Sequence, residues 1–456
     1  MDQENVGAEE QGELFKRRRS EIPDAERVSI LQEKLYQKAK QERGYVFYVL
    51  YDKMFIPYIL REAWKSVKSN DGAPGVDGIT IEKVEDYGVD IYLKELGEEL
   101  RRQTYKPQAV KRVMIPKANG GQRPLGIPTV RDRIAQTVCK MILEPIFEAD
   151  FEDSSYGFRP ERSSKDAITA IKEHLKAGKT EVYDADLSKY FDTIPHDKLQ
   201  IALKQRIADP RMLKLIGKWL KVSVYEDGQY KSGKDNHTGT PQGGVISPLL
   251  ANIYLHLVDR IVNNAHSLFS KHGVKMVRYA DDFVLMGMML PEEVIEKLKS
   301  LLHRMGLSLN EGKTRKIDAK TDNFSFLGFT IRYDKDIKGR DFRYWNIVPS
   351  KKSEQKIRDK VKDYLGKHGH CRAHNIADGL NAILRGWLNY FSITGVSYPA
   401  MSKRRLRVYL YNSLYRYYNR KSQRKSRLYG HKAFEILSAK FGLLDPTKYV
   451  YPLARL

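Results

Sequence analysis

The segment from Val274 to Met286 reads VKMVRYADDFVLM. Two β-prone apolar runs flank the adjacent acids Asp281 and Asp282, a pattern typical of a hairpin with its acids at the tip. Aspartate favours turns, so a plain polar turn is the simplest interpretation. Two neighbouring anions in an apolar hairpin are nevertheless unfavourable unless a cation neutralises them, and Mg²⁺ binds carboxylate oxygens. The hairpin therefore predicts a divalent-metal site.

A third carboxylate is available at the end of another predicted strand, Glu181 to Leu187. Asp184 and Asp186 lie on the same side of an extended chain, so periodicity leaves both as candidates. Three carboxylates on adjacent strands can hold two Mg²⁺ ions about 4 Å apart, an arrangement suited to nucleotidyl transfer. The two segments together predict phosphoryl-transfer chemistry.

The composition favours a globular protein with a polyanionic partner. The 456 residues include 80 Lys+Arg and 57 Asp+Glu, a formal net charge of +23, and 41% hydrophobic residues, enough for two or three folded domains. The apolar runs are shorter than the roughly 20 residues of a membrane-spanning helix, and the first residues are acidic, unlike a signal peptide. Only Cys139 and Cys371 are present, which excludes a disulfide framework. We expect no membrane partner and a cytoplasmic location.

The basic surplus is concentrated near the C-terminus. Residues from Lys351 to Leu456 include 23 Lys/Arg against six Asp/Glu, and the stretch from Lys403 to Arg427 contains no acid. Tyrosines alternate with the basic residues there, and cations beside flat rings suit phosphates and stacked bases. A merely solvated helix face is the alternative. We predict that the nucleic-acid contacts include Arg404, Arg405 and Arg407.

Helix and strand signals alternate in the middle of the chain, which predicts an α+β fold. Ser163, Ser164 and Asp166 predict a helix start, as does the dipeptide Ser247-Pro248. The second helix would carry one apolar stripe with Leu249, Leu250, Ile253, Leu257 and Ile261. Strand-like runs occur at Val110 to Ile115, Glu181 to Leu187, Val274 to Tyr279, Phe283 to Met286, and Phe324 to Ile331.

A series of motifs resembles the group II intron reverse transcriptase/maturase family. Tyr279–Asp282 is similar to the central reverse transcriptase motif, and further motifs follow the family's order at Gly72–Gly78, Ile115–Lys117, Arg123–Pro128, Ser155–Pro160, Asp186–Asp192, Gly239–Pro248 and Phe326–Phe329. The resemblance covers Tyr58 to Tyr429. It implies a right-hand polymerase with fingers and palm, followed by an all-helical thumb or maturase domain. The expected divisions are an N-terminal extension at 1–57, fingers and palm at 58–338, and thumb at 339–456.

The resemblance also assigns roles to individual residues. Asp186 matches the family's metal ligand, with Asp281 and Asp282 completing the catalytic set and Leu187 adding a backbone carbonyl. This set implies two Mg²⁺ ions, for which Mn²⁺ is a possible substitute. The matched nucleotide-binding residues are Lys117, Arg123, Tyr190, Phe191, Gln242 and Lys313, and the matched primer grip is Phe326, Leu327, Gly328 and Phe329.

Structural alternatives accompany several of these roles. Phe191 would exclude a 2′-hydroxyl by its bulk, or it is an ordinary core aromatic. Lys117 and Arg123 would clamp the triphosphate, or they are a solvated hairpin tip. The phenylalanines of the primer grip could simply pack.

The resemblance implies an RNA-directed DNA polymerase that copies RNA into DNA and also binds intron RNA to assist splicing. The implied partners are an RNA template and intron RNA, a DNA primer or target, and deoxynucleoside triphosphates. A splicing cofactor without polymerase activity and a domesticated reverse transcriptase for phage defence or repair are the alternatives. Intact Asp186, Asp281 and Asp282, together with Lys117 and Arg123, argue against the first, and a gene lying inside an intron would argue against the second. The paired cysteines of the family's nuclease domain do not occur in this sequence, so second-strand cleavage is not expected.

Overall fold

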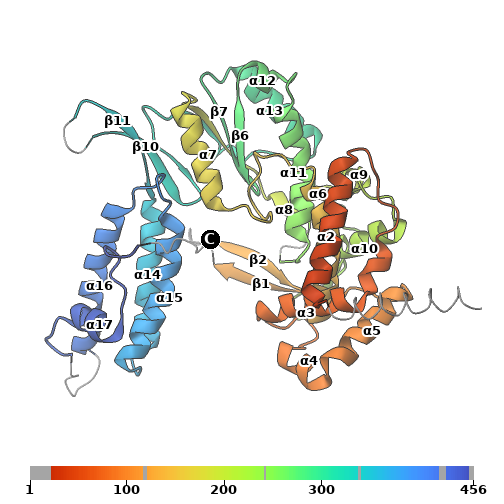
Figure 1. Cartoon of the computed structure of the whole chain (residues 1–456), viewed down its shortest axis with the longest axis horizontal. Coiled ribbons are helices and arrows are strands. Elements are labelled where there is room, and N and C mark those ends of the chain that lie inside the picture. The colour runs from red at the N-terminus through yellow and green to blue at the C-terminus, as the bar shows by residue number, and fades with distance from the viewer. Residues whose placement is uncertain (1–21, 117–120, 241–242, 337–339, 421–427, 451–456) are drawn as a thin grey trace, which may run out of the picture. The chain divides into compact units, whose positions relative to one another are not determined.

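The computed structural model describes residues 22–116, 121–240, 243–336, 340–420 and 428–450 (Figure 1). Tertiary contacts divide the chain into two compact units. The first comprises the chain up to Pro160 with Asp186–Ser267 and Glu292–Asn310, and the second comprises Glu161–Ala185, Leu268–Pro291 and the residues from Glu311 onward. The predicted mixture of helices and strands is confirmed.

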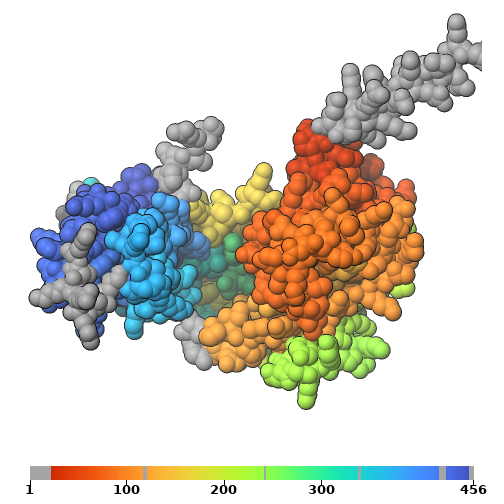
Figure 2. Space-filling view, turned by 90° about the horizontal axis from the view of Figure 1, so that it is seen from below, coloured from red at the N-terminus to blue at the C-terminus, as the bar shows by residue number. Residues whose placement is uncertain are grey.

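The N-terminal helices of the first unit pack around α6 (Val130–Glu148). This helix is buried along most of its length because α2 (Asp24–Gln41) and α3 (Pro57–Ser69) cover it. Thr129 caps its first turn by accepting a hydrogen bond from the backbone N–H of Asp132. The N-terminal helices of this unit also include the 3₁₀ helix η1 (Tyr51–Phe55) and the helices α4 (Ile81–Tyr87) and α5 (Val89–Arg101). Figure 2 shows the side chains of these N-terminal elements as one packed red-to-orange surface.

A four-stranded sheet in the first unit carries the hairpin of β1 (Val110–Pro116) and β2 (Gln122–Ile127). The strand order is β2-β1-β4-β5, with β4 (Val224–Glu226) parallel to β1 and β5 (Gln229–Lys231) antiparallel to β4. β1 confirms the strand predicted at residues 110–115. The helices that follow in this unit are α8 (Tyr190–Thr193), α9 (His196–Lys204), α10 (Pro210–Leu220), α11 (Ser247–Asn263) and α13 (Glu292–Arg304).

Helix α11 begins at Ser247, as the Ser-Pro signal predicts. Leu249, Leu250 and Ile253 are buried on its inner face, but Leu257 is 46% exposed. The predicted apolar stripe is therefore wrong at Leu257, because α6 and α9, which pack on α11, leave that position open to solvent.

The second unit contains a sheet with the strand order β6-β7-β3-β8. Its strands are β6 (Lys275–Tyr279), β7 (Asp282–Gly287), β3 (Glu181–Asp186) and β8 (Arg315–Asp318). Helix α7 (Ser164–Lys176) packs against β6, and α12 (Leu268–Lys271) precedes that strand. The predicted start of α7 is confirmed by a capping box, in which the Ser163 backbone N–H donates a 2.8 Å hydrogen bond to Asp166 Oδ2.

A second sheet in this unit has the order β11-β10-β9. The strand predicted at Phe324 to Ile331 is divided into β9 (Phe324–Phe326) and β10 (Phe329–Lys335). Leu327 and Gly328 interrupt it because their φ angles of 49° and 81° are left-handed and incompatible with a continuous strand. The prediction of an all-helical segment from residue 339 is also wrong at its start, since β11 (Arg343–Pro349) pairs with β10.

Four helices follow β11: α14 (Lys351–Lys367), α15 (Ala373–Phe391), α16 (Ala400–Arg420) and α17 (Ala433–Phe441). α14 packs on α15 and α16, and α17 packs on α15 and α16 (Figure 1). Across the described parts of the chain, no helix is both long enough and apolar enough to cross a membrane.

Candidate active site

The hairpin of β6 and β7 carries the two adjacent aspartates. Tyr279 pairs with Asp282 across the hairpin, so Ala280 and Asp281 form a two-residue turn. Ala280 has a φ of 58°, a left-handed conformation that costs a residue with a Cβ about 1–2 kcal/mol. Asp281 is half-buried and Asp282 is exposed. The predicted hairpin is confirmed, with Asp281 in its turn and Asp282 as the first residue of β7.

The neighbouring strand β3 contains both candidates for the third carboxylate. Asp184 pairs across the strands with Arg315 of β8, and the Arg315 Nε lies 3.8 Å from Asp184 Oδ2. Asp186 is the last residue of β3, which lies next to β7 in the sheet order. Asp184 thus has a basic partner on β8, which favours a structural role for it. Asp186 is half-buried.

The backbone after Asp186 is fixed within the first unit. The Asn310 backbone N–H donates a 2.7 Å hydrogen bond to the Asp186 carbonyl, and Leu187 forms a bridge with Leu309. The Leu187 side chain is buried, consistent with only its backbone being available to a ligand. Among the described residues, no group of three or more His, Cys, Asp or Glu side chains is gathered closely enough to hold a metal ion.

Tyr190 and Phe191, both predicted to bind the nucleotide, have different environments. Tyr190 is buried and donates a 2.6 Å hydrogen bond from its hydroxyl to the Ala251 carbonyl. Its ring packs edge-on against Phe191, which is half-buried. The Tyr190 side chain is thus used in packing, whereas Phe191 stays partly exposed, and the nucleotide-binding roles of both residues remain predictions.

The cationic residues of the predicted nucleotide site lie at exposed positions. Arg123 is exposed on β2, where it pairs with Ile115 of β1. Lys313 is exposed in the turn before β8. Lys117 and Gln242 lie outside the described residues, and their predicted roles remain predictions.

Gly243 lies close to β2. Its φ is 105°, and a Cβ at this position would be 2.0 Å from the Gly126 carbonyl oxygen. A glycine is therefore required here because the loop comes very close to the protein's own backbone.

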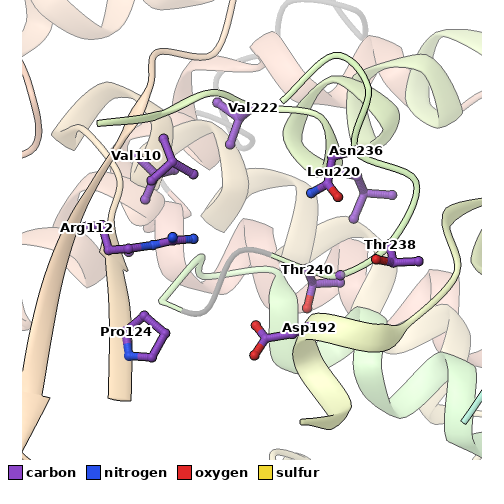
Figure 3. A pocket seen from close by; sticks show the side chains of 12 residues that line it. Val110, Arg112, Pro124, Asp192, Leu220, Val222, Asn236, Thr238 and Thr240 are labelled. Carbon is purple, nitrogen blue, oxygen red and sulfur yellow. The ribbon is translucent and has the colours of Figure 1, made fainter. Parts of the chain in front are cut away.

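A pocket of about 360 Å³ lies beside this loop, between the β1–β2 hairpin and residues 236–240 (Figure 3). Arg112 and Asp192 point into it from opposite walls. Among the described residues, the buried Thr240 hydroxyl has no hydrogen-bond partner. The Thr240 backbone N–H donates a 2.7 Å hydrogen bond to the Phe191 carbonyl. The pocket therefore adjoins the segment that carries Phe191. Its apolar lining includes Val110, Pro124, Leu220, Val222 and Val224.

The turn between β9 and β10 is held by the helices that follow β11. The Tyr390 hydroxyl donates a 2.9 Å hydrogen bond to the Leu327 carbonyl, and Ser353 Oγ donates one of 2.9 Å to the Gly328 carbonyl. Burial raises the pKa of Tyr390, so its hydroxyl remains protonated and able to donate. Phe326 and Phe329 are buried, with the Phe329 ring against Tyr390. Both phenylalanines pack in the interior, and their part in a primer grip remains a prediction.

The three arginines predicted to bind nucleic acid lie on α16, but two have acidic partners. Arg405 Nη1 lies 3.3 Å from Glu354 Oε1, and Arg407 Nε lies 3.0 Å from Asp445 Oδ2. Arg404 is exposed and contacts the Met401 sulfur at 3.8 Å. These ion pairs could not be predicted from the sequence, because both acids are distant from α16 in the chain.

Arg278 was not singled out from sequence, although it is closely associated with the hairpin turn. It is 1% exposed, and its Nη1 donates a 2.9 Å hydrogen bond to the Ala280 carbonyl. A cation inside an otherwise apolar strand was the signal that could have identified it.

Two family models match the chain. Residues 115–331 match "Reverse transcriptase (RNA-dependent DNA polymerase)", and residues 354–433 match "Group II intron, maturase-specific domain". The hairpin, β3 and the β9–β10 turn lie within the first match, and α15 and α16 lie within the second. This combination defines a reverse transcriptase followed by a maturase domain.

Several curated proteins are similar to this chain over much of its length. Protein YkfC of Escherichia coli is 37% identical over 333 residues, which cover 65% of this chain and 86% of YkfC. The group II intron-encoded protein LtrA of Lactococcus lactis is 31% identical, covering 66% of this chain and 59% of LtrA. The uncharacterized 91 kDa protein in the cob intron of Schizosaccharomyces pombe is 27% identical, covering 79% of this chain and 53% of that protein. The chain thus spans little more than half the length of the latter two. It belongs to the group II intron reverse transcriptase/maturase family.

Proposed function

We propose that this protein copies RNA into DNA with a right-hand polymerase and assists the splicing of an intron RNA. In this proposal, residues 58–338 form fingers and palm, residues 339–456 form the thumb or maturase domain, and residues 1–57 form an extension. The observation that carries the polymerase assignment is the hairpin with Tyr279 paired to Asp282 and Asp281 in its turn, within the segment that matches a reverse transcriptase.

The metal ligands in this proposal are Asp186, Asp281 and Asp282, together with the Leu187 carbonyl. The donor set fits Mg²⁺, because adjacent carboxylates on an accessible turn supply the oxygen ligands that this ion prefers. The sheet order β6-β7-β3 supports the choice of Asp186, and the pairing of Asp184 with Arg315 supports excluding Asp184. When bound, two Mg²⁺ ions would activate the primer hydroxyl and stabilise the leaving pyrophosphate.

The protein's own side chains would bind and orient the nucleotide. The exposed Arg123, with Lys117 and Lys313, would neutralise the triphosphate of an incoming deoxynucleotide. The half-buried Phe191 would limit the space at C2′ of its sugar. The β9–β10 turn would hold the primer strand, a role supported by the two hydrogen bonds that fix its carbonyls at Leu327 and Gly328.

The maturase-specific domain would bind intron RNA through α16. The exposed face of this helix carries basic residues beside apolar and aromatic side chains, which can contact phosphates and bases together. Its members include Met401, Arg404, Val408, Tyr415 and Arg416. LtrA, a relative over two thirds of this chain, is by name a group II intron-encoded protein, which supports an intron RNA as the partner.

Primer extension tests the polymerase assignment. The purified chain, with Mg²⁺, a DNA primer, an RNA template and deoxynucleoside triphosphates, should synthesise DNA complementary to the template. The absence of extension, combined with tight intron RNA binding and accelerated splicing, would instead identify a splicing cofactor without polymerase activity.

A further inference from the structure

The guanidinium of Arg278 is buried against the turn that carries Asp281. Arg278 lies on β6 directly opposite Phe283 of β7, and both side chains are almost completely buried. Because side chains alternate between the faces of a strand, Arg278 and Phe283 point to one face of the hairpin. Tyr279 and Asp282 point to the other face. The Arg278 guanidinium therefore lies on the face of the hairpin opposite to the exposed Asp282 side chain.

The hydrogen bond from Arg278 fixes the central peptide of the turn. Its Nη1 donates at 2.9 Å to the Ala280 carbonyl, which belongs to the peptide between Ala280 and Asp281. Two-residue hairpin turns of types I′ and II′ differ in the orientation of this peptide. Ala280 has a positive φ of 58° whereas Asp281 does not, which is the pattern of the type II′ turn. The Arg278 donor selects one orientation of the peptide and thereby the direction in which Asp281 leaves the turn.

Packing alone does not account for an arginine at this position. The neighbouring residues Met276, Val277 and Phe283 are buried and apolar, so Met or Leu would fill the space without the cost of desolvating a charge. A cation beside the turn carbonyl also offsets the mutual repulsion of Asp281 and Asp282, which are adjacent in sequence.

We propose that Arg278 is a positioning residue that holds the turn carboxylates in the orientation needed to bind the catalytic metal ions. The inference rests on the proposed function, because it requires Asp281 and Asp282 to be metal ligands. Arg278 itself would contact neither metal nor substrate. Its effect would pass through the Ala280–Asp281 peptide, so its loss should alter metal binding before it alters the binding of nucleic acid.

The test compares Arg278→Met, Arg278→Lys and the control Phe283→Leu in the full chain bound to primer and RNA template. Mn²⁺ affinity is measured by electron paramagnetic resonance without nucleotide, and kcat and the nucleotide KM by primer extension. Arg278→Met should weaken Mn²⁺ binding and lower kcat by about 10–100-fold, the usual effect of losing a group that orients metal ligands. Arg278→Lys, which keeps the charge and a hydrogen-bond donor, should show a smaller loss of Mn²⁺ affinity and of kcat. The nucleotide KM and nucleic-acid affinity should change little in both.

Phe283→Leu removes packing on the same face without removing the hydrogen bond to the turn. It should lower the melting temperature while leaving Mn²⁺ affinity unchanged. Normal Mn²⁺ affinity in a folded Arg278→Met protein would overturn the inference. If Arg278→Met does not fold, Arg278→Lys and Phe283→Leu are compared at matched melting temperature. Equal weakening of Mn²⁺ binding in these two variants would overturn the inference. Failure of the proposed function looks different, since Asp281→Asn would then retain full primer extension.

Discussion

Lys172 donates a 2.7 Å hydrogen bond from its Nζ to the carbonyl oxygen of Gly395. The same ammonium lies 3.1 Å from the Val396 carbonyl and 3.3 Å from the Tyr398 hydroxyl, and Lys172 is only 5% exposed. Lys172 is on α7, within the reverse transcriptase match, whereas its partners lie between α15 and α16, within the maturase match. One buried cation therefore joins the two matched domains inside the second unit.

Replacing Lys172 with Met should destabilise the second unit. The substitution leaves partly buried carbonyl groups without their donor, which costs about 1–3 kcal/mol in the free energy of unfolding. Chemical denaturation measures the change. The matched control is Lys176→Met on the same helix, where the lysine is exposed and paired with Glu173 at 2.9 Å, and a loss within about 1 kcal/mol is expected. Equal losses in the two variants would contradict the role of Lys172.

Gly243→Ala should damage the first unit, because the added methyl group would overlap the Gly126 carbonyl and the backbone there is left-handed. Strain of this kind costs at least about 1–3 kcal/mol, visible as a lower melting temperature and reduced primer extension. Gly386→Ala is the control, since that glycine lies in α15 and no atom of the described residues is within 4 Å of the added Cβ. The control should be neutral or more stable by up to about 1 kcal/mol. A harmless Gly243→Ala would show that the loop and β2 are not closely apposed in solution.

Phe191→Val should admit ribonucleotides while deoxynucleotide incorporation continues. A ring that excludes a 2′-hydroxyl by overpacking contributes about 1–3 kcal/mol to discrimination. The measurement is the ratio of kcat/KM for the two nucleotide types. Tyr190→Phe is the control, because the buried Tyr190 hydroxyl donates to Ala251 and should not influence sugar choice. A Phe191→Val protein that is less stable yet equally selective would assign this ring to packing.

Arg404→Ala should weaken RNA binding and reduce its salt dependence, because Arg404 is exposed on α16. Loss of one phosphate contact changes the slope of log K against log salt by roughly 0.7–0.9. Arg407→Ala should instead lower stability, since Arg407 is paired with Asp445 and lies over the Phe434 ring. Binding titrations at several salt concentrations distinguish the two. If the slope is unchanged in Arg404→Ala and reduced in Arg407→Ala, the RNA interface lies on a different face.

The local patterns predicted most of the secondary structure near the site. The two apolar runs around Asp281 and Asp282 were sufficient for the hairpin, and the Ser163–Asp166 spacing was sufficient for the start of α7. β11 was missed because the expected helical thumb took precedence over a β-prone run at Arg343–Pro349. That run is a strand because it completes a sheet with β10.

Long-range contacts could not be predicted from these patterns. Periodicity treats Asp184 and Asp186 alike, and only the pairing of β3 with β8 brings Arg315 to Asp184. The pairing of Arg407 with Asp445 likewise depends on how α16 and the chain after α17 pack. The burial of Arg278 also depends on the tertiary environment of β6, although a cation within an apolar run marks the position in the sequence.

The most direct test of the central claim is primer extension on an RNA template by Asp281→Asn, with Asp184→Asn as the matched control. The account predicts that Asp281→Asn loses nearly all extension while RNA affinity and melting temperature stay close to those of the parent, because only a metal ligand is lost. Asp184→Asn should retain most extension, since Asp184 is paired with Arg315. Full extension by Asp281→Asn would contradict the assignment of the hairpin as the catalytic centre.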